Sequence, residues 1–573
     1  QGLFTSHKGL MTITLLDHLT FLYGENDSTR LLELTHSLLN NYRTRIEPRD
    51  GKSTERDSIL ITYGDQIQTP TERPLQTLRK FCKTHLTDIV SGIHILPFYP
   101  WTSDDGFSVV DYRQTDPSLG NWDDVSSMQS FRLMFDGVIN HISSQSAWFQ
   151  GFLRDDPHYR DYFITVEGDP DLSKVVRPRA LPLLTTFKTA AGEKKVWTTF
   201  SEDQIDLNFK NPEVLLEILD ILLIYAERGA SFIRLDAIAY LWKEISTTCI
   251  HLPQTHHVIQ FLRAALNEVA PHIQLITETN VPHADNISYF GDGTNEAQLV
   301  YNFALPPLTL HTFHTGNAGK LSNWARTLAL PTDKTTFFNF LASHDGIGIN
   351  PVRSILSNEE INALVHKTLE HGGLISYKHN TDGTQSPYEM NINYFDALSD
   401  PNAHEPIDLQ VNRFIASQAI MLALIGIPGI YFHSLFGSRG WFEGVRQTGR
   451  NRTINREKLQ LDELQNELTD EHSLRSKVFT KYSQLLKARS SSSAFHPHGA
   501  QTVLDSHPSI FAIERLSPDG ASRVLCLHNV CDQIISVSTG HKSAIDLFTG
   551  QAIQASDVRM LPYQVQWLKI NQV

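Results

Sequence analysis

Eight short apolar runs follow one another along most of this chain, and longer amphipathic segments separate many of them. The runs span residues 59–63, 92–98, 133–140, 232–239, 274–280, 299–305, 335–345 and 427–433. Helical patterns lie between them, as at residues 212–228 and 255–269. A short apolar run is typical of a buried strand, and strands that alternate with helices favour an α/β fold. Eight such units predict a closed (β/α)8 barrel, the TIM barrel.

The spacing of the runs predicts additions to this barrel. The third and fourth runs are separated by roughly ninety residues, more than one helix and its loops require, which predicts an inserted subdomain. Near the N-terminus, Leu31, Leu34, Leu38 and Tyr42 recur at helical spacing. Near the C-terminus, short alternating runs with turn signals such as Pro518-Asp519-Gly520 predict antiparallel strands. The predicted division is an N-terminal helical extension at 1–57, the catalytic barrel at 58–141 and 206–495, the inserted subdomain at 142–205 and a C-terminal β domain at 496–573.

Charge and cysteine usage exclude several classes of function. The 573 residues include 49 basic and 63 acidic side chains, a formal charge of −14. This balance argues against nucleic acid or an anionic membrane as a partner. The four cysteines form no CxxC pair, no signal peptide is visible, and we therefore expect a cytoplasmic location. Whether the chain is a monomer or a homodimer stays open at this point.

Three acidic residues end three of the predicted strands. Asp236 lies near the end of the fourth run, Glu278 lies near the end of the fifth, and Asp345 ends the seventh. Active sites of barrels lie at the carboxyl ends of the strands, so the three carboxyls should converge there. Arg234 shares the fourth strand with Asp236. Burying two opposite charges on a strand costs free energy, so their presence there indicates a functional site. Two carboxyls, one ionised and one protonated, are what retaining glycosyl transfer requires.

The motifs around these acids carry a family resemblance over residues 58–573. The chain resembles the α-amylase superfamily of retaining α-glucosidases, glycoside hydrolase family 13, and within it the sucrose-phosphorylase-like branch. The superfamily resemblance rests on four motifs in order: Asp136-Gly137-Val138-Ile139-Asn140-His141, Ile233-Arg234-Leu235-Asp236, Thr277-Glu278 and Ser343-His344-Asp345. The branch resemblance rests on Ser103-Asp104-Asp105-Gly106-Phe107, Arg177-Pro178-Arg179, Gln204-Ile205-Asp206, His344-Asp345-Gly346-Ile347-Gly348 and the run from Gly449 to Arg456.

The resemblance implies a role for each residue of the site. Asp236 would be the nucleophile, Glu278 the general acid and base, and Asp345 the stabiliser of the transition state. Around them, the implied contacts of the bound glucosyl unit are hydrogen bonds from His141, His344 and Gln204, apolar walls from Phe107, Phe200 and Tyr240, the cation Arg234, and an ion pair between Asp104 and Arg452 that closes the far side.

On the acceptor side, the resemblance implies that Arg179 and Tyr388 face the phosphate. A guanidinium suits phosphate because it binds two oxygens at once. The implied activity is that of a glycosyltransferase-type phosphorylase, in which phosphate is a substrate and no metal or organic cofactor takes part. Among the residues of the motifs, Asp136 and Asn140 are expected to support the strand end rather than to react.

The identity of the acceptor is the open question. We favour 2-O-α-glucosylglycerol as the substrate, because Ser354 stands where the glycerate-type pattern has glycine. Glucosylglycerate is the first alternative, because Arg353 of that pattern is retained. Further alternatives are sucrose or sucrose 6-phosphate phosphorylase, and an α-glucoside hydrolase or transglucosidase. A non-catalytic scaffold of the amylase fold ranks last, because the chain keeps all three acids.

Overall fold

The computed structural model describes residues 14–179, 182–380 and 384–570. Residues 1–13 and 571–573 of the predicted terminal regions lie outside this description, as do residues 180–181 of the predicted insert and residues 381–383. Within the described part, no helix is both long and apolar enough to cross a membrane.

Eight parallel strands close into a barrel, and each predicted apolar run contributes one of them. β1 is hydrogen-bonded to β3 on one side and to β17 on the other, which closes the ring. The strands are β1 (Ile59–Thr62), β3 (Gly92–Ile95), β4 (Arg132–Gly137), β10 (Ala230–Leu235), β11 (Gln274–Thr277), β12 (Leu299–Tyr301), β13 (Thr336–Asn339) and β17 (Ile427–Tyr431). The predicted (β/α)8 barrel is therefore confirmed.

Helices cover the outside of the barrel. The main ones are α3 (Pro74–His85), α6 (Pro212–Glu227), α7 (Pro253–Val269), α9 (Leu305–Thr315), α13 (Ile407–Ala423) and α17 (Leu474–Ser490). α3, α6, α7 and α9 each have proline in the first turn, where a missing N–H costs no intrahelical hydrogen bond. At α6, the side chain of Asn211 also accepts a hydrogen bond from the backbone N–H of Glu213.

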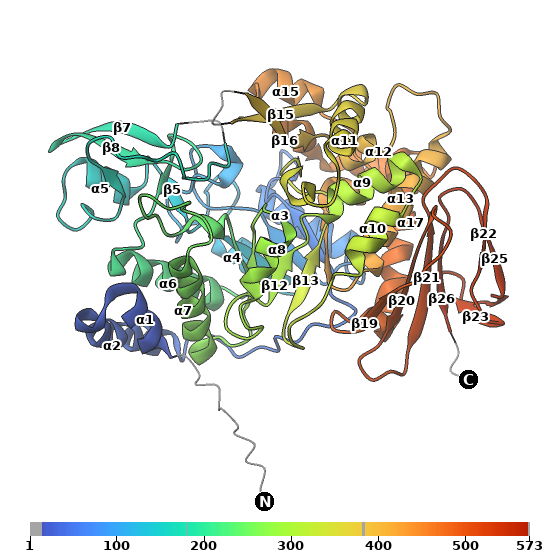
Figure 1. The fold of residues 1–573 in the computed structure, drawn as a ribbon, viewed down its shortest axis with the longest axis horizontal. Helices are drawn as coiled ribbons and strands as arrows, with labels where there is room; N and C mark the ends of the chain where they lie inside the picture. Colours follow the sequence, from blue (N-terminus) through green and yellow to red (C-terminus); the bar gives the residue numbers. More distant parts are fainter. Residues whose placement is uncertain (1–13, 180–181, 381–383, 571–573) are drawn as a thin grey trace, which may run out of the picture.

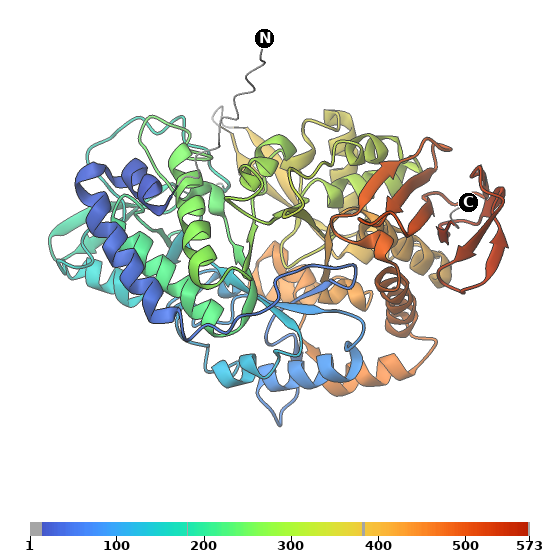
Figure 2. The same ribbon diagram turned by 90° about the horizontal axis from the view of Figure 1, so that it is seen from below.

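Two N-terminal helices, α1 (Leu15–Tyr23) and α2 (Glu25–Tyr42), pack against α6 and α7 (Figures 1 and 2). Thr14 and Asp17 form a capping box at the start of α1. Of the four residues predicted to share a buried face, Leu31 and Tyr42 are buried and Leu38 is partly buried, but Leu34 is exposed. The buried face of α2 runs instead through Leu31, Thr35, Leu39 and Tyr42. Helical structure was predicted as far as residue 57, but it ends at Tyr42, and the chain continues without a helix to β1.

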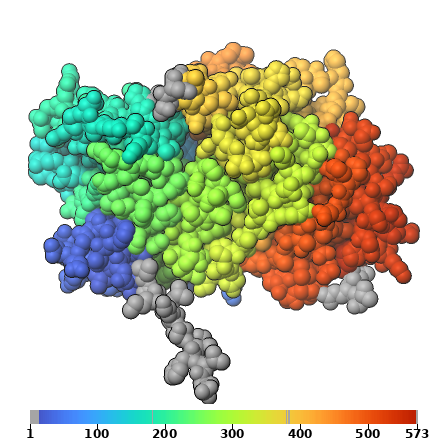
Figure 3. Space-filling view, viewed as in Figure 1, coloured from blue at the N-terminus to red at the C-terminus, as the bar shows by residue number. Residues whose placement is uncertain are grey.

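A small sheet lies between β4 and β10, where the inserted subdomain was predicted. β6 (Thr165–Val166), β8 (Gly192–Trp197) and β7 (Leu184–Thr189) form it in that order, beside α5 (Ala147–Leu153). β5 (His141–Ser143) and β9 (Gln204–Asp206) pair at its base, so the two ends of the insert lie side by side. The insert forms one end of the molecule in Figure 3, opposite the C-terminal strands.

The long connection after β13 also contains a sheet. β14 (Ile347–Gly348), β16 (Gln385–Asn391) and β15 (Leu374–His379) pair in that order, and α11 (Asn358–Glu370) joins β14 to β15. β15 and β16 lie along the upper edge of Figure 1.

The C-terminal strands form an antiparallel sheet in the order β19 (Ala500–Val503), β20 (Ile510–Leu516), β21 (Arg523–Asn529), β26 (Val565–Lys569), β23 (Ser543–Asp546) and β24 (Ala552–Gln554). β22 (Ile535–Ser538) pairs with β25 (Asp557–Met560). Side chains alternate between its two faces, so Ile513 and Trp567 join the main core while Leu525 and Leu568 belong to a separate apolar cluster. This sheet confirms the predicted antiparallel C-terminal strands.

Candidate active site

Asp236 and Glu278 directly follow the last residues of two neighbouring barrel strands, β10 and β11. Leu235 of β10 lies opposite Thr277 of β11, and the next residue of each strand is one of the two acids. Between them, Ala237 adopts a left-handed backbone with φ of 50°, a conformation that is unfavourable for a residue with a Cβ atom. Its N–H donates to Glu278 Oε2 at 2.9 Å. The strained turn therefore fixes the Glu278 carboxyl beside Asp236.

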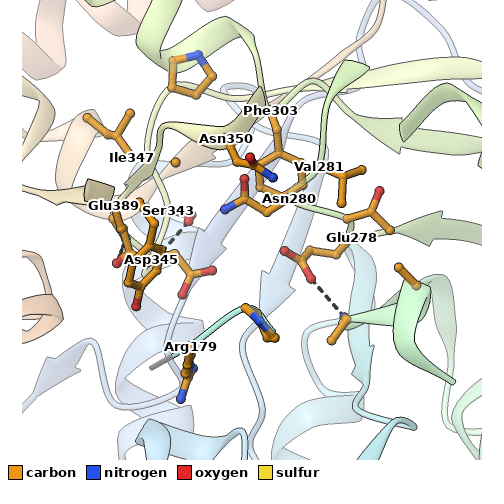
Figure 4. Close-up of a pocket in the computed structure, with 18 of the residues that line it drawn as sticks. Arg179, Glu278, Asn280, Val281, Phe303, Ser343, Asp345, Ile347, Asn350 and Glu389 are labelled. Atoms are coloured by element: carbon orange, nitrogen blue, oxygen red, sulfur yellow. Dashed lines mark hydrogen bonds between the residues drawn. The ribbon is translucent and has the colours of Figure 1, made fainter. Parts of the chain in front are cut away.

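Asp345 joins the other two acids from a loop. The sequence predicted that the seventh strand runs to Asp345, but β13 ends at Asn339. Phe340 and Leu341 are buried beyond that end, so their apolar character reflects a buried loop rather than a longer strand. In Figure 4, Glu278 and Asp345 point into the same space.

A buried arginine holds Asp236 in place. Arg234 is 2% exposed, and its Nη1 lies 2.9 Å from Asp236 Oδ1 and 2.5 Å from Asp136 Oδ1. Its Nε donates to the Tyr301 hydroxyl at 3.1 Å. Asp136 Oδ2 also lies 2.6 Å from His94 Nε2. Asp136 therefore holds Arg234 in place, and it does not line the cavity. The guanidinium is thereby fixed beside one particular acid.

The two neighbouring carboxyls are coupled in their titration. Burial raises the pKa of Asp236 and the pKa of Glu278, and for Asp236 the charge of Glu278 adds to this effect. Two carboxyls this close do not both ionise readily, so they titrate as a pair. Arg234 makes a direct ion pair with Asp236, whereas Glu278 has no ion pair among the described residues. We therefore place the negative charge on Asp236 and the proton on Glu278.

Asp345 is held ionised by two arginines. Burial acts to raise its pKa, but the charges of Arg452 and Arg456 outweigh burial and keep the pKa well below its usual range. Arg452 Nη1 lies 2.6 Å from Asp345 Oδ1. The same guanidinium binds both oxygens of the buried Glu389, at 2.9 and 2.7 Å. Arg452 is thus fixed between two carboxylates.

The predicted ion pair between Asp104 and Arg452 is wrong. Asp104 Oδ2 lies 2.9 Å from Arg179 Nη2, and Gln204 Nε2 donates to the same oxygen at 3.2 Å. The reason is that Asp345 and Glu389 already engage Arg452, while the inserted segment brings Arg179 to Asp104. Arg179 also lies over the ring of Phe200, 5.5 Å from its centroid.

Neutral histidines and aromatic rings surround the acids. Burial lowers the pKa of His141 to about 4 and that of His344 to about 3, so neither imidazole carries a charge at neutral pH. His344 stacks on Phe107 with 4.8 Å between ring centroids, and His141 Nε2 lies 2.9 Å from the Phe107 carbonyl. The rings of Phe200 and Tyr240 meet edge to face at 5.5 Å. Neutral hydrogen-bonding groups and aromatic faces suit a sugar ring.

A cavity of about 320 Å³ opens over the barrel mouth. The predicted residues that line it are Arg179, Phe200, Tyr240, Glu278, Asp345, Arg353, Tyr388 and Arg452. The predicted residues that do not line it are Asp104, Phe107, His141, Gln204, Arg234, Asp236 and His344. The side chain of Asp236 nevertheless keeps 13% of its surface exposed.

The structure adds residues that the sequence did not single out. Glu389 orients Arg452 and accepts a hydrogen bond from the Gly346 N–H at 3.1 Å. Arg456 donates to the His344 carbonyl at 2.7 Å and forms an ion pair with Asp105. Arg456 is one of four arginines within residues 446–456, and this density indicated a role for some of them. Nothing in the sequence indicated a role for Glu389. No group of three or more His, Cys, Asp or Glu side chains in the described ranges is arranged to hold a metal ion.

Comparisons with known proteins agree with this geometry. Residues 86–357 match the model of the alpha amylase catalytic domain. Glucosylglycerate phosphorylase of Allomeiothermus silvanus is 50% identical over 97% of this chain and 98% of its own. Glucosylglycerol phosphorylase of Marinobacter adhaerens is 29% identical over 77% of this chain and 88% of its own.

Among solved structures, sucrose 6F-phosphate phosphorylase of Thermoanaerobacter thermosaccharolyticum has the same fold. The two superpose with a TM-score of 0.73 at 24% identity, over 90% of this chain and 100% of that one. The chain belongs to the α-amylase family, glycoside hydrolase family 13, and within it to the sucrose-phosphorylase-like α-glucoside phosphorylases.

Proposed function

We propose that this enzyme is a retaining glucosylglycerate phosphorylase, which converts glucosylglycerate and phosphate into α-glucose 1-phosphate and glycerate. The observation that carries the proposal is the 50% identity, over nearly the full length of both chains, to a protein of that name. The relative named for glucosylglycerol is 29% identical. Glycerol, the acceptor favoured from the sequence, therefore gives way to glycerate, its first alternative.

In the first step, a carboxylate oxygen of Asp236 attacks the anomeric carbon of the glucosyl unit. The bond from that carbon to the glycerate oxygen breaks, and Glu278 gives its proton to the departing oxygen. A β-glucosyl ester of Asp236 and free glycerate result. The ion pair of Arg234 with Asp236 and the absence of a cation contact at Glu278, among the described residues, support this assignment of roles.

In the second step, phosphate takes the place that glycerate has left. A phosphate oxygen attacks the anomeric carbon from the same face, its proton passes to the Glu278 carboxylate, and the ester bond to Asp236 breaks. The product is α-glucose 1-phosphate, and both acids return to their starting states. Two inversions give overall retention.

Asp345 stays ionised throughout and does not exchange protons. Its fixed negative charge favours the positive charge that develops on the sugar ring in the transition state. The ion pairs of Arg452 with Asp345 and Glu389 support this role, because they hold the carboxylate ionised and in one orientation. No step calls for a metal or organic cofactor.

We also propose that the enzyme works in the cytoplasm. All four cysteines are free thiols, and Cys82, Cys249 and Cys526 are buried. Free thiols support a reducing compartment, since secreted proteins usually pair their cysteines.

Synthesis from glucose 1-phosphate tests the acceptor. With the same donor, initial rates on glycerate should exceed those on glycerol at least tenfold at equal, subsaturating concentrations. Water serves as the third acceptor, so release of free glucose measures hydrolysis in the same assay. Equal rates on glycerate and glycerol would contradict the proposal, and so would glucose as the main product.

A further inference from the structure

Two cationic side chains, Arg353 and Lys378, lie together at one side of the active-site cavity. Both line it. Lys378 lies on β15, opposite Ser386 of β16. Arg353 follows the short helix Asn350–Val352, and its Nη2 donates to the carbonyl of Pro387, the next residue of β16, at 2.9 Å. The β15–β16 hairpin therefore brings the two cations to the same place.

Carboxylates neutralise two other arginines of the cavity. Arg452 has Asp345 and Glu389 as partners, and Arg179 has Asp104. Within the described residues, neither Arg353 nor Lys378 forms an ion pair. Burial lowers the pKa of Lys378, and the like charge of Arg353 lowers it further. Two cations held together without a counter-ion favour the binding of an anion.

The chemistry of the acceptor indicates which anion fits. Glycerate differs from glycerol by a carboxylate in place of a hydroxymethyl group, so the residue that selects glycerate must recognise negative charge. Hydrogen bonds between a cation and a carboxylate are about twice as strong as neutral ones. Resting on the function proposed above, we propose that Lys378, together with Arg353, binds the carboxylate of glycerate and thereby decides which acceptor the enzyme uses.

Phosphate carries the same kind of charged oxygens and enters the same side of the cavity after glycerate has left. The experiment must therefore separate the two anions. Transfer from glucose 1-phosphate to glycerate and to glycerol shares one donor half-reaction, so the ratio of the two kcat/KM values cancels every effect on phosphate. The same ratio also cancels any loss of folded enzyme, because both rates come from one preparation.

The test compares Lys378→Gln and Arg353→Gln with the wild type. Each substitution should lower the glycerate-to-glycerol ratio at least tenfold, and Lys378→Arg should keep most of it. Glyceramide, which replaces the carboxylate by a neutral amide, gives a second readout. The wild type should prefer glycerate over glyceramide, and Lys378→Gln should lose most of that preference. Lys477→Gln, on a partly exposed lysine of α17 paired with Asp408, is the control and should leave the ratio unchanged.

Three results would overturn the inference. One is a glycerate-to-glycerol ratio within twofold of wild type in both Lys378→Gln and Arg353→Gln. Another is that, in phosphorolysis, these variants raise only the KM for phosphate and leave the use of glycerate unchanged. The third is loss of the ratio on Arg177→Gln only, since Arg177 also lines the cavity and lies outside the hairpin. A wild type that does not prefer glycerate would instead refute the function proposed above, so the two failures are distinguishable.

Discussion

Two neighbouring acidic side chains differ in their partners, and this difference supports the roles that we propose for them. Asp236 has a fixed guanidinium at 2.9 Å, whereas Glu278 accepts one hydrogen bond from a backbone N–H. In a buried pair that holds one proton, the carboxyl next to the cation gives its proton up first. The arrangement favours the negative charge on Asp236 and the proton on Glu278, as the proposed mechanism requires.

The pH dependence of phosphorolysis tests this assignment. Glu278 acts in its protonated form, and burial raises its pKa above that of an ordinary glutamate. The acid form is therefore present at low pH and persists to a higher pH than usual, and kcat/KM should fall as the pH rises through this raised pKa. Glu278→Gln cannot lose a proton, so its residual activity should lack the alkaline limb. It should also be lower by about 10²–10⁴-fold, the usual effect of a general acid.

The matched measurement is the pH profile of Tyr388→Phe, which changes a cavity side chain but keeps Glu278. Its alkaline limb should remain. An alkaline limb of unchanged position in Glu278→Gln would show that another group provides the proton.

Helix α17 holds several elements of the barrel together through one side chain. Arg489 is 1% exposed and has no carboxylate partner in the described part of the chain. Its Nη1 donates to the Asp57 carbonyl at 3.0 Å, its Nε to Leu422 at 3.1 Å and its Nη2 to Gly426 at 3.1 Å. These carbonyls precede β1 and β17, so one guanidinium joins the two strands that close the barrel to α17.

Replacing this arginine should destabilise the fold. Arg489→Met keeps most of the apolar stem but leaves several buried carbonyls without a donor, at a cost of about 1–3 kcal/mol for each orphaned group. With three or more carbonyls left unpaired, we expect a total loss of about 3 kcal/mol or more, measured as a shift in the urea unfolding transition. Arg446→Met is the control, because Arg446 pairs with Glu443 on the exposed surface and should cost less than about 1 kcal/mol. Equal shifts for the two variants would refute the role of Arg489.

Sequence patterns predicted the strands of the barrel but not all the contacts between its loops. All eight barrel strands followed from apolar runs, because strands buried in the barrel carry few polar residues. The extra reach assigned to the seventh run was wrong because a buried loop has the same composition as a strand. The partner of Asp104 was wrong because Arg179 reaches it from an insert, and a motif records residue types but not which loops meet. Glu389 was missed because none of the sequence motifs includes it.

At the scale of the whole molecule, three segments that are distant in sequence build one site. The barrel provides Asp236, Glu278 and the loop of Asp345, the insert provides Arg179 and Phe200, and the β15–β16 hairpin provides Lys378, Tyr388 and Glu389. The barrel fixes the positions of the reacting groups, since its strands are buried and in register. The insert and the hairpin both line the cavity, and we propose that they surround the acceptor.

Phosphorus and proton NMR of the reaction with glucosylglycerate and phosphate tests the central claim most directly. The account predicts that α-glucose 1-phosphate and glycerate appear together in equal amounts, and that the reaction stops in Asp236→Asn. Glucosylglycerol, offered under the same conditions, should react at least tenfold more slowly. Formation of β-glucose 1-phosphate would contradict the double displacement. Release of free glucose independent of phosphate would contradict the phosphorylase itself.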